Sequence, residues 1–270
     1  MLNVIKAGGQ VLRQGCLEIA EDLKKLVFGE GEKVVFVHGG GVDVTEMAER
    51  LGLKQKFVTS PEGFRSRYTD RETVEIYNMV MSGKINKNLV SLFQSLGIPS
   101  LGLSGVDGAI LMAKRREKMI IVDDKGKRRV SDAGFTGRIC KVNDEILRTI
   151  VDKGYVPVIS PVAISQEFEL LNVDSDRAAA NIAIAMHADR LIYMTDVEGV
   201  IFGGKFLRKL TIQQTKEVLS KIGGGMSTKV QAAAEAVSNG VKEAVIASGK
   251  GKFPVLSAIK HLCGTIITYE

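Results

Sequence analysis

Tryptophan is absent from this chain of 270 residues, and the chain has only three histidines, three cysteines and five prolines. The cysteines, Cys16, Cys140 and Cys263, lie far apart and form no CxxC pair, so neither a disulfide framework nor a zinc site is indicated. The three histidines form no cluster at metal-ligand spacing, which argues against a protein-held metal and against histidine-based catalysis. The chemistry therefore has to come from other side chains and from the backbone.

Long apolar runs are also missing. No stretch approaches the roughly 18 residues that a membrane-spanning helix needs, and the N-terminus lacks a charged segment followed by an apolar signal core. We therefore expect a cytoplasmic protein that contacts no membrane. Apolar residues make up 45% of the chain and charged residues 25%, a balance typical of a globular enzyme.

The net charge of +6 is unevenly distributed. One basic stretch contains Lys114, Arg115, Arg116, Lys118, Lys125, Lys127, Arg128, Arg129, Arg138 and Lys141. Such a stretch either docks an acidic partner or keeps a surface solvated, and the charge alone leaves both interpretations open. A nucleic-acid partner is not expected, because no aromatic residues are interleaved with the basic ones in a known binding pattern.

Short β-branched runs alternate with segments of helical period along the chain. The candidate strands cover residues 3–6, 33–37, 99–102, 156–160, 190–195, 243–247 and 264–269. The candidate helices cover 17–27, 43–51, 70–81, 84–96, 143–153, 176–187, 212–220, 228–239 and 254–261. This alternation predicts an α/β protein with a largely parallel, doubly wound central sheet between two helical layers.

One segment breaks the alternation. Residues 109–141 contain short strand-like runs around a turn at Asp123-Asp124-Lys125-Gly126, and we expect antiparallel hairpins over one end of the sheet. The composition changes again after the strand that ends in Ser160-Pro161. We therefore predict an N-terminal lobe over residues 1–165 and a C-terminal lobe over residues 166–270 that share one sheet.

Two glycine-rich turns follow the first two strands. Lys6-Ala7-Gly8-Gly9 places a lysine and two glycines at a strand end, where backbone N–H groups can approach an anion closely. His38-Gly39-Gly40-Gly41 then opens a helix, so that N–H groups and a helix N-terminus converge. Each turn alone could be a simple connection, but together they favour binding of a phosphate or carboxylate.

A third glycine-rich turn is Gly223-Gly224-Gly225-Met226-Ser227-Thr228-Lys229. It is not a Walker A sequence, so phosphate handling has to be assembled from separate loops. A lysine in the first turn of a helix is electrostatically unfavourable, and we expect an anion near Lys229 to resolve that conflict.

Two carboxylates stand close together in Leu171-Asn172-Val173-Asp174-Ser175-Asp176, just before a predicted helix. Either aspartate could cap that helix. Since capping accounts for only one of them, we expect the other to project into the site.

These four elements, together with Thr195-Asp196-Val197-Glu198-Gly199 after the fifth predicted strand, resemble the amino acid kinase family and most closely its acetylglutamate kinase branch. The resemblance covers essentially the whole chain. Further matches are Gly63-Phe64-Arg65, Tyr68-Thr69-Asp70, Met81-Ser82-Gly83-Lys84-Ile85-Asn86-Lys87, Gly102-Leu103-Ser104-Gly105-Val106-Asp107-Gly108 and Thr136-Gly137-Arg138.

Within that branch, Arg65-Ser66-Arg67-Tyr68-Thr69-Asp70 is similar to kinases that act on aminoadipate or glutamate attached to the amino-group carrier protein LysW. Acetylglutamate kinases usually carry one arginine there. An acidic carrier protein would use Arg65, Arg67 and the basic stretch as complementary charge.

The resemblance also implies roles for individual residues. Lys6 and Lys229 would stabilise the transferring phosphoryl group, and Asp176 would hold both lysines in position. Gly40, Gly41, Arg65 and Asn172 would bind the amino-acid part of the acceptor. Gly8, Gly9, Thr195, Asp196, Gly224 and Gly225 would contact the nucleotide, ATP. Where the family often has Asn-x-Asn-Ala-Asp, this chain has Asp174 as the third residue, which either changes acceptor specificity or changes only the cap.

The implied reaction needs no general base, because a carboxylate acceptor with a pKa near ~4.3 is already ionised at neutral pH. The enzyme has to supply in-line positioning and positive charge, from lysines, N–H groups and a Mg²⁺ ion carried with ATP. The product is an acyl phosphate.

Two other functions remain open at this point. One is an acetylglutamate kinase of arginine synthesis, from which the two arginines and the basic stretch would distinguish this chain. The other is a non-catalytic nucleotide-binding regulator, which would be expected to lack one of the two lysines or Asp176. The resemblance implies a homodimer through the helix around residues 72–80. Inhibition by arginine is not expected, because the chain starts almost directly at its first strand.

Overall fold

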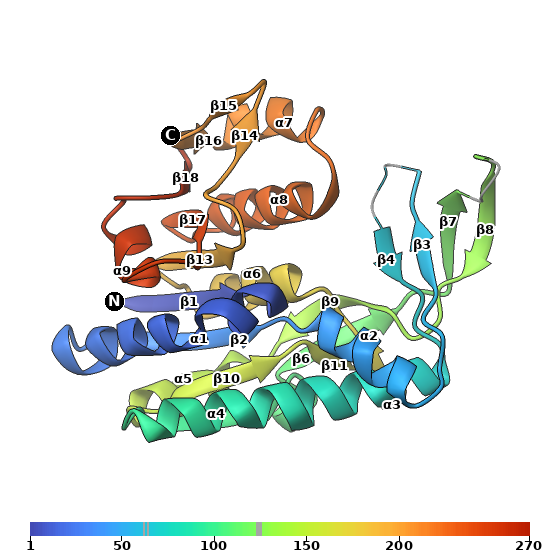
Figure 1. Ribbon diagram of the computed structural model, residues 1–270, viewed down its shortest axis with the longest axis horizontal. Helices are drawn as coiled ribbons and strands as arrows, with labels where there is room; N and C mark the ends of the chain where they lie inside the picture. Colours follow the sequence, from blue (N-terminus) through green and yellow to red (C-terminus); the bar gives the residue numbers. More distant parts are fainter. Residues whose placement is uncertain (62, 64, 123–125) are drawn as a thin grey trace.

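The computed structural model describes residues 1–61, 63, 65–122 and 126–270, with Arg65 described by its backbone only. Its central sheet has eight strands in the order β16-β18-β17-β13-β1-β2-β10-β5. In that order the strands are Lys209–Thr211, Thr265–Thr268, Glu243–Ser248, Arg190–Thr195, Leu2–Ala7, Lys33–His38, Val156–Ser160 and Ser100–Ser104. All neighbouring pairs are parallel except β17 with β18. The predicted largely parallel sheet is confirmed (Figure 1).

Helices cover both faces of this sheet. One face packs against α1 (Gly9–Lys24), α4 (Asn86–Ser95) and α9 (Pro254–Ile259), and the other against α5 (Asp144–Asp152), α6 (Ser175–Ala185) and α8 (Gly224–Ser238). The alternation of side chains along β2 shows the physical reason: Val34 and Phe36 belong to the first core, and Val35 and Val37 belong to the second. The three-layer α/β/α architecture is therefore confirmed.

Two smaller sheets, antiparallel except for the pair of β11 with β6, lie at one end of the central sheet. A four-stranded sheet with the order β4-β3-β7-β8 contains Arg65–Arg67, Phe57–Thr59, Lys118–Val122 and Arg128–Asp132. A second sheet with the order β12-β11-β6-β9 contains Leu170–Asn172, Val162–Ile164, Leu111–Arg115 and Gly137–Val142. Figure 1 shows β3, β4, β7 and β8 extending away from the body of the molecule, beyond α2 (Gly41–Arg50) and α3 (Arg71–Asn78).

The predicted hairpins of residues 109–141 are present as the antiparallel pairs β6 with β9 and β7 with β8. Of the predicted turn at 123–126, only Gly126 lies within the described residues. The β3–β4 hairpin is not among the strands predicted from the sequence. Its strands have three residues each, too few to show a clear period-2 pattern.

The remaining elements are short helices and strands, some of which continue the helices already described. The π-helical segments Lys25–Gly29 and Met79–Ile85 follow α1 and α3, and the second joins α3 to α4. The 3₁₀ turn Asp107–Ala109 follows β5, α7 spans Ile212–Leu219, and β14 (Ile201–Phe202) pairs with β15 (Lys205–Phe206).

Two predicted helices begin too late. The first starts at Gly9 rather than at residue 17, and α8 starts at Gly224 rather than at residue 228. Each helix begins with glycine, whose low helix propensity favours a loop, and in α1 the non-helical Gly15 kinks the helix just before residue 17. The helices therefore reach directly to the glycine-rich turns, which places their N-termini at the candidate site.

The apolar positions around residues 72–80 pack mainly inside the chain. Val74, Ile76, Tyr77 and Val80 are at most 5% exposed, whereas Met79 is 55% exposed. Since four of these five side chains belong to the core of one chain, they are no evidence for a partner surface. A homodimer through this helix stays a prediction.

Candidate active site

Lys6 lies near the carboxyl end of the central strand β1. It is opposite Val37 on β2 and Tyr193 on β13, and only 4% of the residue is exposed. Alternation along β1 places Lys6 on the same face as Val4, which packs into the core beneath α6. A lysine so deeply buried requires a paired charge.

Asp176 supplies that charge and brings two lysines together. Its Oδ1 lies 2.7 Å from Nζ of Lys6, and its Oδ2 accepts a hydrogen bond from Nζ of Lys229 at 3.0 Å. Burial would raise the pKa of the Asp176 carboxyl, but the two lysine charges outweigh burial and hold the pKa below its usual value. The family resemblance implies this bridging contact, and the structure contains it. The catalytic roles of the three residues stay predictions.

Lys229 approaches this carboxylate from α8. Because that helix starts at Gly224, Lys229 stands in its second turn, not in the first turn as the sequence suggests. Its side chain is 15% exposed, compared with 5% for Lys6. The electrostatic repulsion between Lys229 and the helix N-terminus is therefore weaker than expected. Asp176 also provides a counter-charge.

Asp174 has the other role expected of an aspartate before a helix. Its Oδ1 accepts a hydrogen bond from the backbone N–H of Arg177 at 2.9 Å, which makes Asp174 the N-cap of α6. The expectation that only one of the two aspartates caps the helix is confirmed, since Asp176 contacts the two lysines instead. Desolvation by the surrounding protein and the negative charge of Asp176 raise the pKa of the Asp174 carboxyl.

The two glycine-rich turns meet through their backbones. The backbone N–H of Gly39 donates to the carbonyl of Ala7 at 2.9 Å, and that of Gly8 donates to Met194 at 3.2 Å. A Cβ on Gly9 would lie only 3.0 Å from Cα of Gly40, so this contact requires glycine. The helices that begin at Gly9 and Gly41 thus direct two N-termini to one place.

Lys6 adjoins these turns. A Cβ on Gly8 would lie 3.9 Å from Nζ of Lys6, and a Cβ on Gly39 would lie 3.5 Å from Oγ of Ser175, the residue before Asp176. N–H groups of two helix N-termini and two ammonium groups therefore gather around one point, an arrangement suited to an anion with spread charge, such as a transferring phosphoryl group.

Of the predicted acceptor residues, Asn172 adjoins a cleft of about 560 Å³. Asn172 and Asp174 line this cleft, and the Asn172 amide also donates to Oγ1 of Thr69 at 2.9 Å. Gly40 and Gly41 are not among its lining residues, and the side chain of Arg65 lies outside the described residues. The structure thus brings Asn172 to this cleft and leaves Gly40 and Gly41 at the glycine turns.

Arg67 also lines this cleft, although the sequence suggests for it only a docking charge. Its guanidinium donates to the carbonyl of Gly41 at 2.7 Å and to Oγ1 of Thr45 at 2.8 Å, and also to Gln55. Arg67 thereby ties β4 to the first turn of α2. The structural role of Arg67 has no separate signal in the sequence, because both arginines stand in one short motif.

The predicted nucleotide residues lie in three places, and the first pair, Gly8 and Gly9, stands at the start of α1. Oγ1 of Thr195 donates to Asp196 at 3.1 Å at the end of β13, and Asp196 lines a cleft of about 950 Å³ with Ser248 and Lys250. Gly224 and Gly225 stand at the open start of α8 and do not line that cleft. Gly224 has a φ of +65°, so its backbone requires glycine.

Tyr193 is a residue of the site that sequence reasoning missed. This fully buried side chain donates from its hydroxyl to the backbone carbonyl of Asp176 at 2.9 Å, and burial raises its pKa well above the usual value. It thereby anchors the first turn of α6 to β13. An apolar strand offers no signal for this role, because a tyrosine there is usually part of the core.

Two absences concern the described part of the chain only. No three His, Cys, Asp or Glu side chains there are grouped so that they could hold a metal ion. None of the helices described is long and apolar enough to cross a membrane.

Comparison with known proteins identifies the class. The amino acid kinase family model matches residues 1–248, and this chain belongs to that family. The LysW-aminoadipate/LysW-glutamate kinase of Sulfolobus acidocaldarius is 43% identical over 265 residues, which cover 98% of this chain and 99% of that protein. A relative from Nitrosopumilus maritimus with the same name, given provisionally, is 47% identical over 266 residues, which are 98% of this chain and 99% of the relative.

A solved structure supports the fold. The carbamate kinase of Giardia lamblia bound to AMP-PNP has a TM-score of 0.69 at 17% identity, covering 99% of this chain and 98% of that chain. At this identity the likeness concerns the fold alone. The family and the fold predicted from the sequence are both confirmed.

Proposed function

We propose that this chain is an ATP-dependent kinase that phosphorylates the side-chain carboxylate of aminoadipate or glutamate carried on LysW. The product would be an acyl phosphate in lysine biosynthesis, formed in the cytoplasm. The observation that carries this proposal is the bridge from Asp176 to Lys6 and Lys229, in a chain whose relatives of that name match it over 98% of its length.

The chemistry follows from the charges at the site. An ionised acceptor carboxylate attacks the γ-phosphorus of ATP without a general base, and the bond to the β–γ bridging oxygen breaks. Lys6 and Lys229 neutralise the phosphoryl oxygens, while the N–H groups at the glycine turns hold the phosphates in line. Asp176 keeps the two ammonium groups apart from bulk water and close to each other, at 2.7 and 3.0 Å from its oxygens.

Mg²⁺ fits this site as a companion of ATP. The described residues offer no carboxylate cluster for it, so phosphate oxygens and water would supply its ligands. When bound, it would neutralise part of the negative charge on the phosphate oxygens.

The placement of the basic residues supports the carrier-linked acceptor. Arg115 is occupied, because it pairs with Glu169 at 3.0 Å and lies over the Phe135 ring. The other described members of the basic stretch are exposed on β6, β7, β8, β9 and their connections: Lys114, Arg116, Lys118, Lys127, Arg128, Arg129, Arg138 and Lys141. Lys125 lies outside the described residues. These strands lie beside the acceptor cleft, where Arg116 and Lys118 line the wall.

Three further features belong to the same proposal. Residues 1–165 would bind the acceptor and form the homodimer, and residues 166–270 would bind ATP. The strands β1, β2, β10 and β5 of the first part and β13, β17, β18 and β16 of the second form one sheet, so the division concerns function and not the fold.

The experiment measures ATP-dependent acyl phosphate, trapped with hydroxylamine. LysW-linked aminoadipate, LysW-linked glutamate and free acetylglutamate are compared at equal concentration. We expect kcat/KM to be highest on the carrier-linked acceptors. Preference for acetylglutamate would keep the kinase chemistry but replace the acceptor, and no acyl phosphate with any acceptor would refute the proposal.

Substitution of the lysines tests the mechanism. We expect Lys6→Ala and Lys229→Ala each to lower kcat by about 10² or more, because each removes a donor that acts on the transition state. Lys33→Ala is the matched control, since Lys33 lies at the far end of β2 in an exposed ion pair with Asp152. A folded Lys6→Ala protein with wild-type kcat would contradict the mechanism.

A further inference from the structure

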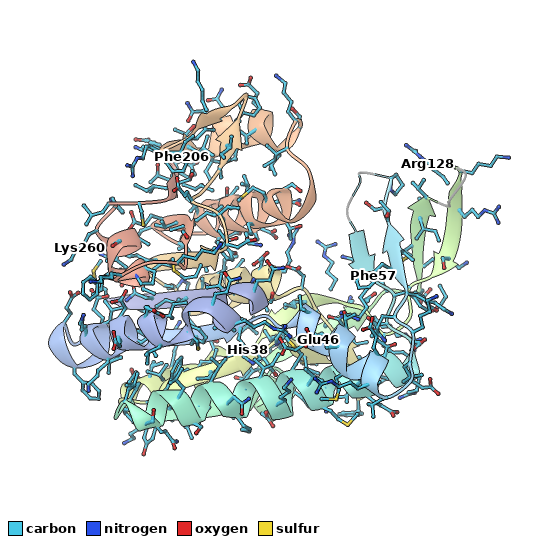
Figure 2. All side chains as sticks on the ribbon, viewed as in Figure 1. His38, Glu46, Phe57, Arg128, Phe206 and Lys260 are labelled. Atoms are coloured by element: carbon cyan, nitrogen blue, oxygen red, sulfur yellow. The ribbon has the colours of Figure 1, made fainter. Side chains whose placement is uncertain are left out.

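His38 is a fully buried histidine beside the glycine turn, and the proposed phosphoryl chemistry does not use it. It ends β2, and its exposed fraction is 0%. Its Nδ1 lies 3.2 Å from the carbonyl oxygen of Gly39, and its Nε2 lies 3.3 Å from the side-chain nitrogen of Asn86. His38 is labelled near the centre of the molecule in the view of Figure 2.

Asn86 is also fully buried and is held from three sides. Its side-chain nitrogen lies 2.8 Å from the carbonyl oxygen of Val158 and 3.3 Å from that of Leu103, on two strands of the central sheet. One of its two N–H groups donates to Val158, and the other is shared between Leu103 and Nε2 of His38. Its oxygen accepts from Nζ of Lys87 at 3.2 Å, and Lys87 in turn donates to Gly102. These contacts fix which end of the amide is the donor, and this donor end faces His38.

The neighbours of His38 determine its tautomer. A carbonyl oxygen can only accept, so the proton belongs on Nδ1, and Nε2 is then free to accept from Asn86. Burial lowers the pKa of His38 to about 4, so the ring is neutral near pH 7. The Nδ1–H group of the ring therefore donates to the carbonyl oxygen of Gly39, and the contact of Nε2 with Asn86 holds the ring in this orientation.

The contact between His38 and the Gly39 carbonyl also fixes the direction of the Gly40 N–H group in the same peptide unit. None of the described peptide bonds is cis, and in a planar trans peptide the C=O and the following N–H point in opposite directions. With the Gly39 oxygen directed to the ring, the N–H of Gly40 points away from it. The Gly40 nitrogen lies beside Gly9, 3.2 Å from the place that a Cβ of Gly9 would take.

A peptide between two glycines is the one most easily flipped, because neither residue has a Cβ that resists the rotation. A flip would turn the Gly39 carbonyl, a negative end, toward the incoming anion and turn the N–H away. We propose that His38 is a positioning residue that, held by Asn86, prevents this flip and keeps the Gly40 N–H directed at the anion. This inference rests on the proposed phosphoryl chemistry, but its structural part does not depend on the substrate.

The first experiment reads the ring and the peptide directly by NMR on ¹⁵N-labelled protein. With only three histidines, the imidazole nitrogens can be assigned by comparing wild type with His38→Asn. We expect His38 to be neutral at pH 7 with its proton on Nδ1. A proton on Nε2, or a charged ring, would overturn the proposal whether or not the enzyme phosphorylates LysW-linked acceptors.

The second experiment compares two substitutions of similar polarity. The amide nitrogen of Asn at position 38 can take the place of Nδ1, whereas that of Gln reaches toward Nε2. We expect His38→Asn to retain kcat within about 3-fold and to leave the Gly40 amide resonance near its wild-type position. We expect His38→Gln to shift that resonance and to lower kcat by about 10-fold or more, a part of the 10² to 10³ lost when such a donor is removed outright.

The pair separates positioning from mere stability. Both variants disturb the core, so both can lower Tm, but only loss of the Gly39 contact should lower kcat. Equal kcat in the two folded variants, or an equal loss in both, would contradict the proposal. An inactive wild type would instead refute the proposed function, and the NMR result would still decide the role of the ring.

Discussion

Two aspartates separated by a single residue have different tasks because they occupy different positions of the same helix. Asp174 precedes α6 and uses Oδ1 to cap it, whereas Asp176 lies within the first turn, where its side chain reaches both lysines. The hydroxyl of Tyr193 holds the backbone of Asp176 at 2.9 Å. The residue type is the same at both positions, so the different roles follow from the position of each aspartate relative to the start of α6.

Asp174 lends itself to a pair of substitutions. Asp174→Asn keeps an oxygen for the N–H of Arg177, and Asp174→Ala removes it. We expect Ala to lower the free energy of unfolding by about 1 kcal/mol and Asn to change it by less, because the cap is retained. Urea titration measures both. If Asn destabilises as much as Ala, the charge of Asp174 and not its cap is what stabilises the helix.

The buried His38 predicts a pH dependence of stability. Its pKa is about 4 in the folded protein and about 6.5 when unfolded, so below pH 6.5 the unfolded chain binds the extra proton. Stability is therefore complete above pH 6.5 and is lost as pH falls toward 4. Relative to His38→Asn, wild type should lose roughly 3 kcal/mol of unfolding free energy between pH 7 and pH 4. Parallel pH profiles of the two proteins in urea would contradict this.

At the scale of elements, the site is built where helices begin. The first turns of α1 and α2 meet through Gly9 and Gly40, and α6 and α8 bring Asp176 and Lys229. Arg13 on α1 forms a bidentate contact with Glu46 on α2, at 2.8 and 2.7 Å, which holds these two helices together outside the site. The geometry of the anion site is therefore a property of helix packing as much as of individual side chains.

Gly9→Ala tests this packing. The added Cβ would meet the backbone of Gly40 at 3.0 Å, and since backbone cannot rotate away, the two turns have to separate by a few tenths of an ångström. We expect kcat to fall by roughly 10-fold or more, because small misplacements near the reacting groups are costly. Gly83→Ala is the control, since a Cβ there meets nothing within 4 Å. Wild-type kcat in a folded Gly9→Ala protein would show that the turns tolerate separation.

The sequence predicts the elements with strong periodicity and misses those governed by glycine or by distant contacts. All seven predicted strands are present in the central sheet, because buried β-branched runs have few alternatives. The starts of α1 and α8 are predicted too late, because local propensity treats Gly9 and Gly224 as loop residues. Within the site, the pairing of Asp176 with both lysines is what the family resemblance implies. The roles of Arg67 and Tyr193 are not, since each depends on a partner that the fold alone brings near.

At the scale of the whole molecule, part of the basic stretch lies away from the body. Lys118, Arg128 and Arg129 stand on β7 and β8, which extend from the body, while Lys260 lies on the opposite side in the view of Figure 2. Phe57, on β3 of the same extension, is also labelled there. A small acceptor within a cleft of about 560 Å³ cannot contact the far end of this extension, but a protein that carries the acceptor can.

Ionic strength therefore distinguishes the two acceptors. Between about 0.1 M and about 1 M salt the Debye length falls from about 10 Å to about 3 Å, which screens exposed charges but affects buried ones less. We expect KM for LysW-linked aminoadipate to rise by about 10-fold or more over this range, and KM for acetylglutamate to change by less than about 3-fold. Arg128→Glu should raise KM for the carrier-linked acceptor at low salt, and Lys260→Glu, the matched charge reversal on the opposite side, should not. If salt and Arg128→Glu leave KM for the carrier-linked acceptor unchanged, the basic strands serve only as a solvated surface, and recognition of the carrier must lie within the cleft itself.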